Sequence, residues 1–353
     1  MAITFARSVG FAGQSYGFEG FNYTSAYKFL MERIRAAIAT DPTTIQTRLG
    51  GTPTITAGQL MQRRNLCISG SAVLAKHAGS AGYWVENDGT TSGPLLTAAV
   101  AAIGGYADKP VILCYSHGEQ DATLISTFSD AALFKTGVQT ILTALRTACN
   151  AGTPTNVPVF IDILGIRYST QETGEHWIRD ALIDVVTAGT NVYRGAEKHA
   201  LRLGNTTHPT RDMSGYGQMG AHVARKVENW LLLGTNLPGP SIASAVRTGN
   251  NVAVTITVPT GSLQKPLQPD FFGLFDGSGN AIAITNYSWA GNVLTITGAS
   301  QPTTFRYPVT TRIGTGAAKV ADINRIVRLA APSSPLYTGE PGLVLESAKA
   351  FAV

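Results

Sequence analysis

The sequence is poor in cysteine and in charge. Three of its 353 residues are cysteine, and 14% are Asp, Glu, Lys or Arg. Cys67, Cys114 and Cys149 have none of the spacings of zinc or redox motifs, and an odd number of cysteines cannot pair completely. Each lies in an apolar stretch, so we expect buried free thiols and no disulfide framework.

Two classes of partner are excluded by what the sequence lacks. The net charge is only +5, and no block of Lys and Arg of the nucleic-acid-binding type occurs, so we expect no nucleic-acid partner. No stretch approaches the roughly eighteen apolar residues that span a bilayer. The first ten residues also lack the basic start and apolar run of a secretory signal peptide. We therefore expect a soluble chain with no membrane partner.

Glycine is abundant, with 38 residues, and strand-like runs alternate with helical stretches as far as residue 233. Period-two or continuous apolar runs predict strands over 2–12, 64–70, 109–118 and 157–166. Helical spacing predicts helices over 25–40, 93–106, 130–150, 175–189 and 214–233. This alternation predicts an α/β fold, a parallel sheet with helices on both faces.

The pattern changes after the Pro-Gly-Pro sequence at 238–240. Apolar and polar residues alternate at period two over 251–259, 271–279, 281–289 and 292–298, and Gly, Asn and Pro separate these runs. Such short alternating runs are typical of an antiparallel β-sandwich. A length of 353 residues also exceeds what one core ordinarily organises, so we predict two domains, 1–236 and a smaller β-rich accessory domain over 237–353.

Four polar segments follow predicted strands or precede the last predicted helix. They are Gly13-Gln14-Ser15, Ser69-Gly70-Ser71, "SHGEQDA" over 116–122, and "NTTHPT" over 205–210. The first fits a serine nucleophile on a tight turn, although glycines around a serine also mark ordinary turns. Loops at the carboxyl ends of parallel strands gather at one edge of the sheet, where α/β proteins place their functional groups.

In this order, the four segments resemble the sequence blocks of the SGNH hydrolases, and within them the carbohydrate-esterase branch that includes sialate O-acetylesterases. The resemblance extends over about residues 8–233. It implies a flavodoxin-like fold and hydrolysis of O-acetyl esters on carbohydrate, or of other small esters, without a cofactor. A serine directly after the first strand does not fit the α/β-hydrolase fold, in which several strands precede the nucleophile.

The resemblance also implies roles for individual residues. Ser15 would be the nucleophile and His208 the base that accepts its proton. The backbone N–H groups of Ser15 and Gly70 and the side-chain amide of Gln120 would form the oxyanion hole.

Three further residues are candidates for contact with the substrate: Gln14, His117 and Glu119. His117 stands where relatives usually have glutamine, and two roles are open for it: a residue that lines the pocket or a histidine that ends a strand. Glu119 and Asp121 could contact substrate, but charged residues at a loop-to-helix junction often cap the helix or pair with an arginine. We expect one of these structural roles for Asp121.

A second departure from the resemblance is Asn205, where most relatives have aspartate. An amide can hold an imidazole tautomer but cannot stabilise imidazolium as a carboxylate does. Either a Ser-His dyad operates with Asn205 or a backbone group as its orienter, or an acid from elsewhere turns inward, with Asp212 and Glu119 as the nearest choices.

The remaining histidines, His77, His176, His199 and His222, have no ligand spacing, and we expect structural or surface roles and no metal site. A non-catalytic glycan-binding or virion structural protein is the alternative function, and the missing aspartate favours it. The Gly-, Thr- and Ser-rich, weakly charged sequence also resembles phage tail-associated esterases. That resemblance leaves a virion or homo-oligomer partner open, and a virion-associated or cytoplasmic location.

Overall fold

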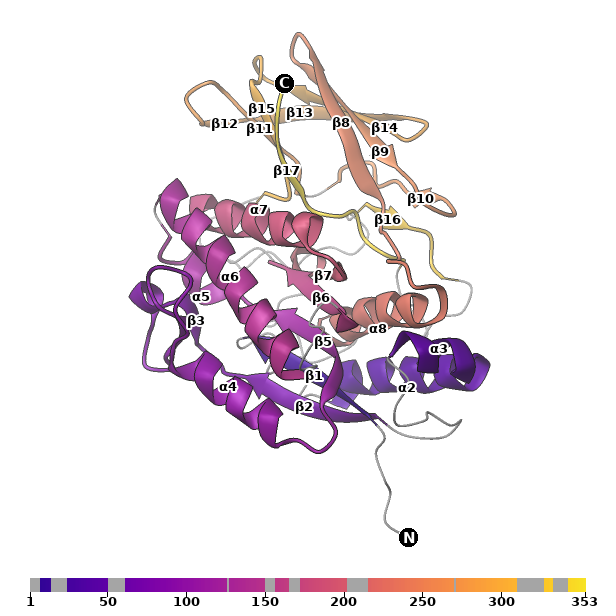
Figure 1. Cartoon of the computed structure of the whole chain (residues 1–353). Helices are drawn as coiled ribbons and strands as arrows, with labels where there is room; N and C mark the ends of the chain where they lie inside the picture. The colour runs from indigo at the N-terminus through magenta and orange to yellow at the C-terminus, as the bar shows by residue number, and fades with distance from the viewer. Residues whose placement is uncertain are drawn as a thin grey trace. The chain divides into compact units, whose positions relative to one another are not determined.

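The structure is a computed structural model, and it describes residues 7–13, 24–49, 61–125, 127–149, 156–164, 172–201, 215–269, 271–309, 327–332 and 342–353. These residues belong to two compact units (Figure 1). The first unit is drawn from Met1–Leu164, Thr173–Ala196 and Arg211–Leu237, and the second from Gly165–Glu172, Glu197–Thr210 and Pro238–Val353. The division into independent domains at residue 237 stays a prediction.

One five-stranded sheet organises the first unit. Its strands, in chain order, are β1 (Arg7–Gly13), β2 (Met61–Cys67), β5 (Pro110–Ser116), β6 (Val159–Ile163) and β7 (Val192–Glu197). Their spatial order is β2-β1-β5-β6-β7, and β1 pairs in parallel with β2 and β5, as β5 does with β6. Counted along the chain this is 2-1-3-4-5, the flavodoxin-like order. The predicted α/β fold with a parallel sheet is confirmed.

Helices cover both faces of this sheet (Figure 1). They are α2 (Thr24–Thr40), α3 (Pro42–Arg48), α4 (Pro94–Gly105), α5 (Glu119–Ala122), α6 (Phe128–Cys149), α7 (Glu172–Ala188) and α8 (Tyr216–Leu233). Helices α4, α6 and α7 contribute to one apolar core with the sheet, whereas α2 packs against α8 and α3. Short elements lie between β2 and α4: β3 (Ala72–Leu74), η1 (Ala75–His77) and β4 (Tyr83–Val85).

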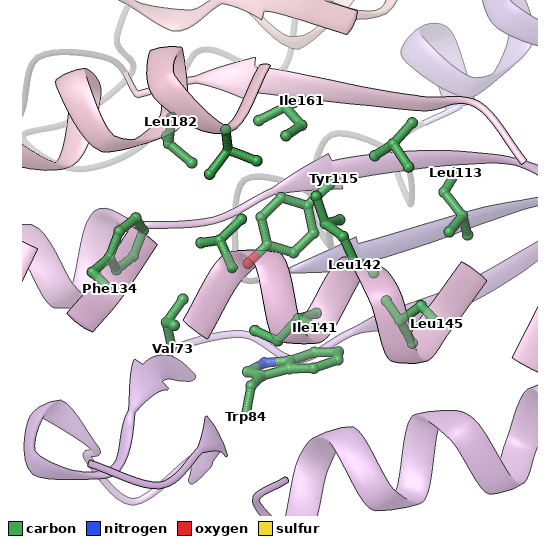
Figure 2. Packing of buried hydrophobic residues seen from close by; sticks show 14 of the residues in the cluster. Val73, Trp84, Leu113, Tyr115, Phe134, Ile141, Leu142, Leu145, Ile161 and Leu182 are labelled. Carbon is green, nitrogen blue, oxygen red and sulfur yellow. The ribbon is translucent and has the colours of Figure 1, made fainter. Parts of the chain in front are cut away.

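Alternation along the strands explains why both faces are apolar. On β5, Leu113 and Tyr115 belong to the core with α6, whereas Ile112 and Cys114, also buried, point to the other face. Figure 2 shows the ring of Tyr115 and the indole of Trp84 packed with Ile141 of α6. A strand buried on both faces reads as a continuous apolar run, which is the pattern that predicts this strand.

The three cysteines are free and buried, as predicted. Burial raises the pKa of the Cys114 thiol well above its ordinary value and that of Cys149 to about 12. These thiols therefore stay protonated at neutral pH and act as small apolar side chains.

The second unit consists mainly of antiparallel strands. One four-stranded sheet has the order β13-β14-β9-β8 and another the order β12-β11-β15-β17, while β10 pairs with β16. The strands are β8 (Ser241–Thr248), β9 (Asn251–Thr257), β10 (Leu263–Gln264), β11 (Gly273–Phe275), β12 (Ala281–Ile282), β13 (Ile284–Ala290), β14 (Val293–Gly298), β15 (Thr304–Tyr307), β16 (Arg328–Leu329) and β17 (Ala348–Ala352). Val254 of the first sheet and Phe305 of the second share one apolar core, which is the arrangement of a β-sandwich.

A buried polar cluster lies in the second unit next to that core. The 3-10 helix η3 (Lys198–Ala200) carries His199, whose Nε2 is 3.0 Å from the hydroxyl of Tyr307 and whose Nδ1 is 3.4 Å from Oγ of Ser347. Ser347 Oγ also donates to Glu197 at 2.6 Å. All four side chains are buried, so their hydrogen bonds fasten η3 to the C-terminal segment. The role of His199 in this cluster is structural.

Candidate active site

Three of the four sequence segments begin at one edge of the sheet. β2, β1 and β5 are neighbours, and the register pairs Gly13 with Cys67 on one side and with Ser116 on the other. The N–H of Ile68 donates to the carbonyl of Gly13 at 2.9 Å, which extends the pairing past the end of β2. The chain therefore enters the first three segments from adjacent positions at the carboxyl edge.

The glycine that begins the first segment is required by its surroundings. Gly13 has a φ of +130°, a conformation that L side chains rarely adopt. A Cβ at this position would also overlap the carbonyl oxygen of Ser116 on the neighbouring strand. Only glycine lets the chain leave β1 this close to the end of β5.

The structure places half of the predicted site residues. Gly70, His117, Glu119 and Gln120 are described, whereas Gln14, Ser15, Asn205 and His208 lie outside the described residues, as does Asp212. The predicted nucleophile, base and orienter therefore stay predictions. The described four belong to the loop after β2 and to the segment after β5.

A tight turn holds Gly70. The N–H of Ser71 donates to the carbonyl of Ile68 at 3.3 Å, and Gly70 has a φ of +74° at the third position, which is typical of a type II turn. Among the described residues, a Cβ there would meet only Ala81, at 3.5 Å, which is an ordinary contact. Glycine is therefore favoured by the backbone conformation and not by a lack of room. Among the described residues, none accepts a hydrogen bond from the N–H of Gly70.

The segment after β5 turns into α5 through a second glycine. Gly118, with a φ of +117°, caps the helix, and a Cβ on it would lie 2.7 Å from Cγ2 of Ile178. Glu119 is 2% exposed, whereas Gln120 on the same short helix is partly exposed. Gln120 is thus the side chain of this helix that can reach a ligand from the solvent side.

Asp121 has a different role from the one the sequence predicts. Its buried carboxylate accepts hydrogen bonds from the N–H groups of Val73 at 2.8 Å and Leu74 at 3.2 Å, and one oxygen lies 2.9 Å from Nδ1 of His77. The expectation of a helix cap or an arginine partner is wrong. A buried carboxylate needs several donors, and here strand β3 and His77 supply them.

His117 is fully buried and bonded at both ring nitrogens. Nδ1 lies 3.1 Å from the hydroxyl of Tyr115, and Nε2 lies 3.1 Å from the carbonyl oxygen of Ser71. The ring also meets Trp84 edge to face, with centroids 6.0 Å apart. While these bonds hold, neither nitrogen is open to a substrate, which favours the structural role among the two left open by the sequence.

No group of three His, Cys, Asp or Glu side chains that could hold a metal ion occurs in the part of the chain that the structure describes. Three of the other histidines have carboxylate partners: His77 binds Asp121, His176 pairs with Asp180 one turn along α7 at 3.3 Å, and Nδ1 of His199 lies 3.7 Å from Glu197. Within the described ranges, no helix is long and apolar enough to cross a bilayer.

Sequence reasoning missed the residues that support the glycine turn. Ser71 donates through Oγ to the carbonyl of Ile68 at 2.8 Å and accepts from Nε1 of Trp84 at 3.1 Å. The one sequence signal for Trp84 and Tyr115 is their residue type, because a buried indole N–H or phenol hydroxyl needs a hydrogen-bond partner.

Comparison with known proteins gives a likeness of fold. A carbohydrate acetylesterase from Xanthomonas citri superposes with a TM-score of 0.56 at 13% sequence identity, over 85% of this chain and 74% of that chain. A protein from Arabidopsis thaliana matches over 52% of this chain and 64% of its own at 15% identity. Its TM-score of 0.34 is too low to indicate a shared fold. No protein-family model and no curated protein matches the sequence.

Proposed function

We propose that this protein is a serine esterase of the SGNH type that hydrolyses small acyl esters, O-acetyl groups on carbohydrate above all. The observation that carries the proposal is the convergence of three segments at one sheet edge, with Gly13 at the end of β1, Gly70 in the loop after β2 and Gln120 in α5, just after β5. The likeness of fold to a carbohydrate acetylesterase supports the same conclusion.

The proposed chemistry is acyl transfer in two steps. Ser15 Oγ attacks the ester carbonyl carbon while His208 takes its proton, and the negative charge moves to the carbonyl oxygen. The N–H groups of Ser15 and Gly70 and the amide of Gln120 donate to that oxygen. The sugar alkoxide leaves with the proton from His208, and water, deprotonated by the same base, then releases acetate and free Ser15.

Three observations fit the oxyanion role of the described residues. Gly70 lies in a turn in which no described residue accepts from its N–H, and Gln120 is partly exposed on a helix whose other polar side chains are buried. The buried Asp121 carboxylate fastens α5 to β3, the strand that follows the Gly70 turn. Donors that are already in place need not rearrange when negative charge develops on the carbonyl oxygen in the transition state.

The test is hydrolysis of p-nitrophenyl acetate and of acetylated xylan, with a fluorophosphonate as trap. We expect Ser15→Ala and His208→Ala to lose at least about a thousandfold in kcat. Mass spectrometry should find the phosphonyl group on Ser15. The exposed Ser278 is the matched control, and Ser278→Ala should keep full activity.

Two results would contradict the proposal. Labelling of a serine other than Ser15, or unchanged turnover in His208→Ala, would remove the mechanism. A protein that binds acetylated glycan but neither hydrolyses it nor reacts with the trap would be the non-catalytic glycan-binding alternative.

A further inference from the structure

His117 forms the middle of a buried chain of hydrogen bonds that ends at the proposed oxyanion hole. The chain runs from the hydroxyl of Tyr115 to Nδ1, and from Nε2 to the carbonyl oxygen of Ser71, with both distances 3.1 Å. Tyr115 and His117 have no solvent exposure. Ser71 directly follows Gly70, the glycine whose N–H the proposed function uses.

The chemistry of the three groups fixes the tautomer. A carbonyl oxygen can only accept, so Nε2 of His117 carries a proton and donates to Ser71. In the neutral ring Nδ1 is then an acceptor, and Tyr115 donates to it. Burial raises the pKa of the Tyr115 phenol well above its ordinary value, so this donor keeps its proton over the working pH range.

The same turn is held at a second point. Ser71 Oγ accepts from the indole of Trp84 at 3.1 Å and donates to the carbonyl of Ile68 at 2.8 Å, and the N–H of Ser71 closes the turn onto that same carbonyl. Figure 2 shows that Trp84 and Tyr115, the two outer partners, are themselves packed in the apolar core. The turn is therefore tied to the rigid interior through His117 and Trp84.

We propose that His117 is a positioning residue, whose Nε2–H···O=C bond to Ser71 sets the direction in which the preceding Gly70 N–H points. The inference rests on the proposed function, in which that N–H stabilises the oxyanion. If the bond is lost, the peptide units of the Ile68–Ser71 turn rotate more freely, and the donor is aimed less well at the developing charge.

A pair of substitutions separates the two ring nitrogens. Glutamine at this position carries an amide N–H near the place of Nε2, whereas asparagine reaches only the place of Nδ1. We expect His117→Gln to keep kcat within about threefold and His117→Asn to lower kcat by about ten- to a hundredfold, with little change in KM in either, because an oxyanion donor acts in the transition state. Both variants remove the same ring, so a merely structural role would affect them equally.

Amide hydrogen exchange of the peptide that contains residues 68–71 gives a readout that does not depend on activity. We expect faster exchange in His117→Asn and near-native exchange in His117→Gln. If the wild-type protein has no esterase activity, the proposed function fails, and the exchange result alone decides whether His117 holds the turn.

Equal kcat values in the two variants, a loss confined to KM, or equal exchange would overturn the inference. If His117→Asn does not fold, Tyr115→Phe keeps the buried ring and removes only the donor to Nδ1. That variant leaves the bond to Ser71 as the one described hydrogen bond of the two that hold the ring in place, so we expect a smaller fall in kcat at unchanged KM. Unchanged kcat and unchanged exchange in Tyr115→Phe would overturn it as well.

Discussion

Glycines with positive φ occur in both units, but their surroundings differ. In the first unit, a Cβ on Gly13 would overlap the backbone of Ser116, and one on Gly118 would lie 2.7 Å from Ile178. In the second unit, Gly261 and Gly279 also have positive φ values, +73° and +81°, and nothing lies within 4 Å of the added atom. Gly13 and Gly118 at the sheet edge of the first unit are needed for room as well as for conformation, whereas these two glycines of the sandwich are needed for conformation alone.

The largest expected effect comes from an alanine at the crowded edge. Gly13→Ala combines an unfavourable φ with overlap against a fixed strand, and we expect it to lower the free energy of unfolding by about 3 kcal/mol or more. Gly279→Ala has only the conformational cost, about 1 kcal/mol. Denaturant unfolding of both variants measures the difference, and equal losses would remove the distinction between the two regions.

Carboxylates give the second comparison. Asp121 of the first unit and Asp276 of the second each accept hydrogen bonds from two backbone N–H groups, those of Val73 and Leu74 and those of Ser278 and Asn280 respectively. Asp121 is buried and Asp276 is partly exposed. Asp121→Ala leaves two buried N–H groups without an acceptor, so we expect the free energy of unfolding to fall by about 3 kcal/mol.

For Asp276→Ala we expect a much smaller loss, because water replaces the carboxylate as the acceptor. Hydrogen bonds from Asn280 lower the pKa of Asp276 below its ordinary value, so its contribution is present at neutral pH and disappears as the pH falls through that pKa. Thermal melts of both variants at pH 7 and pH 3 check this order. A larger shift for Asp276→Ala at pH 7 would contradict it.

The smallest expected effect is the alkylation of the buried thiols, which reports on the first unit alone. All three cysteines belong to the first unit, so alkylation follows the opening of that unit and not of the sandwich. We expect almost no labelling of the native protein at pH 8. Since the pKa of Cys149 rises from 9.0 to about 12, the thiol favours the folded state below pH 9, and this contribution is lost as the pH rises toward 12. Rapid labelling of Cys149 under native conditions would show that α6 opens locally.

Long periodic helices and apolar strands could be predicted from the sequence, and short irregular elements could not. α2, α4 and α6 match the predicted helices within two residues at each end, because their apolar positions repeat at helical spacing over many turns. Strand β7 was missed, since "VYRGAE" contains an arginine and a glycine. Gly195 is explained only by the fold, in which the Asp162 carboxylate occupies the space of its missing side chain and accepts from the N–H of Ala196.

The candidate site shows the same limit. The strand-end position of Gly13, Gly70 and Gln120 could be predicted, because parallel strands end at a common edge. The partners of Asp121 could not, because the N–H groups that it binds are 47 and 48 residues away in the chain and carry no side-chain signal. Helix α3, by contrast, carries a local signal in the sequence: Asp41 accepts from the N–H of Thr44, and Pro42 begins the helix, a common start signature.

The place of β1 between β2 and β5 has a consequence for the order in which the chain acquires its structure. Oγ of Ser8 in β1 donates to the carbonyl of Asp108, 100 residues later. A ribosome adding about 5–20 residues per second needs roughly 5–20 seconds to supply that partner. Throughout this time Val9 and Phe11, which are fully buried in the finished protein, have no β5 to cover them. The strand that leads to the proposed nucleophile is thus synthesised well before β5, and its pairing in the sheet cannot be completed until β5 has emerged.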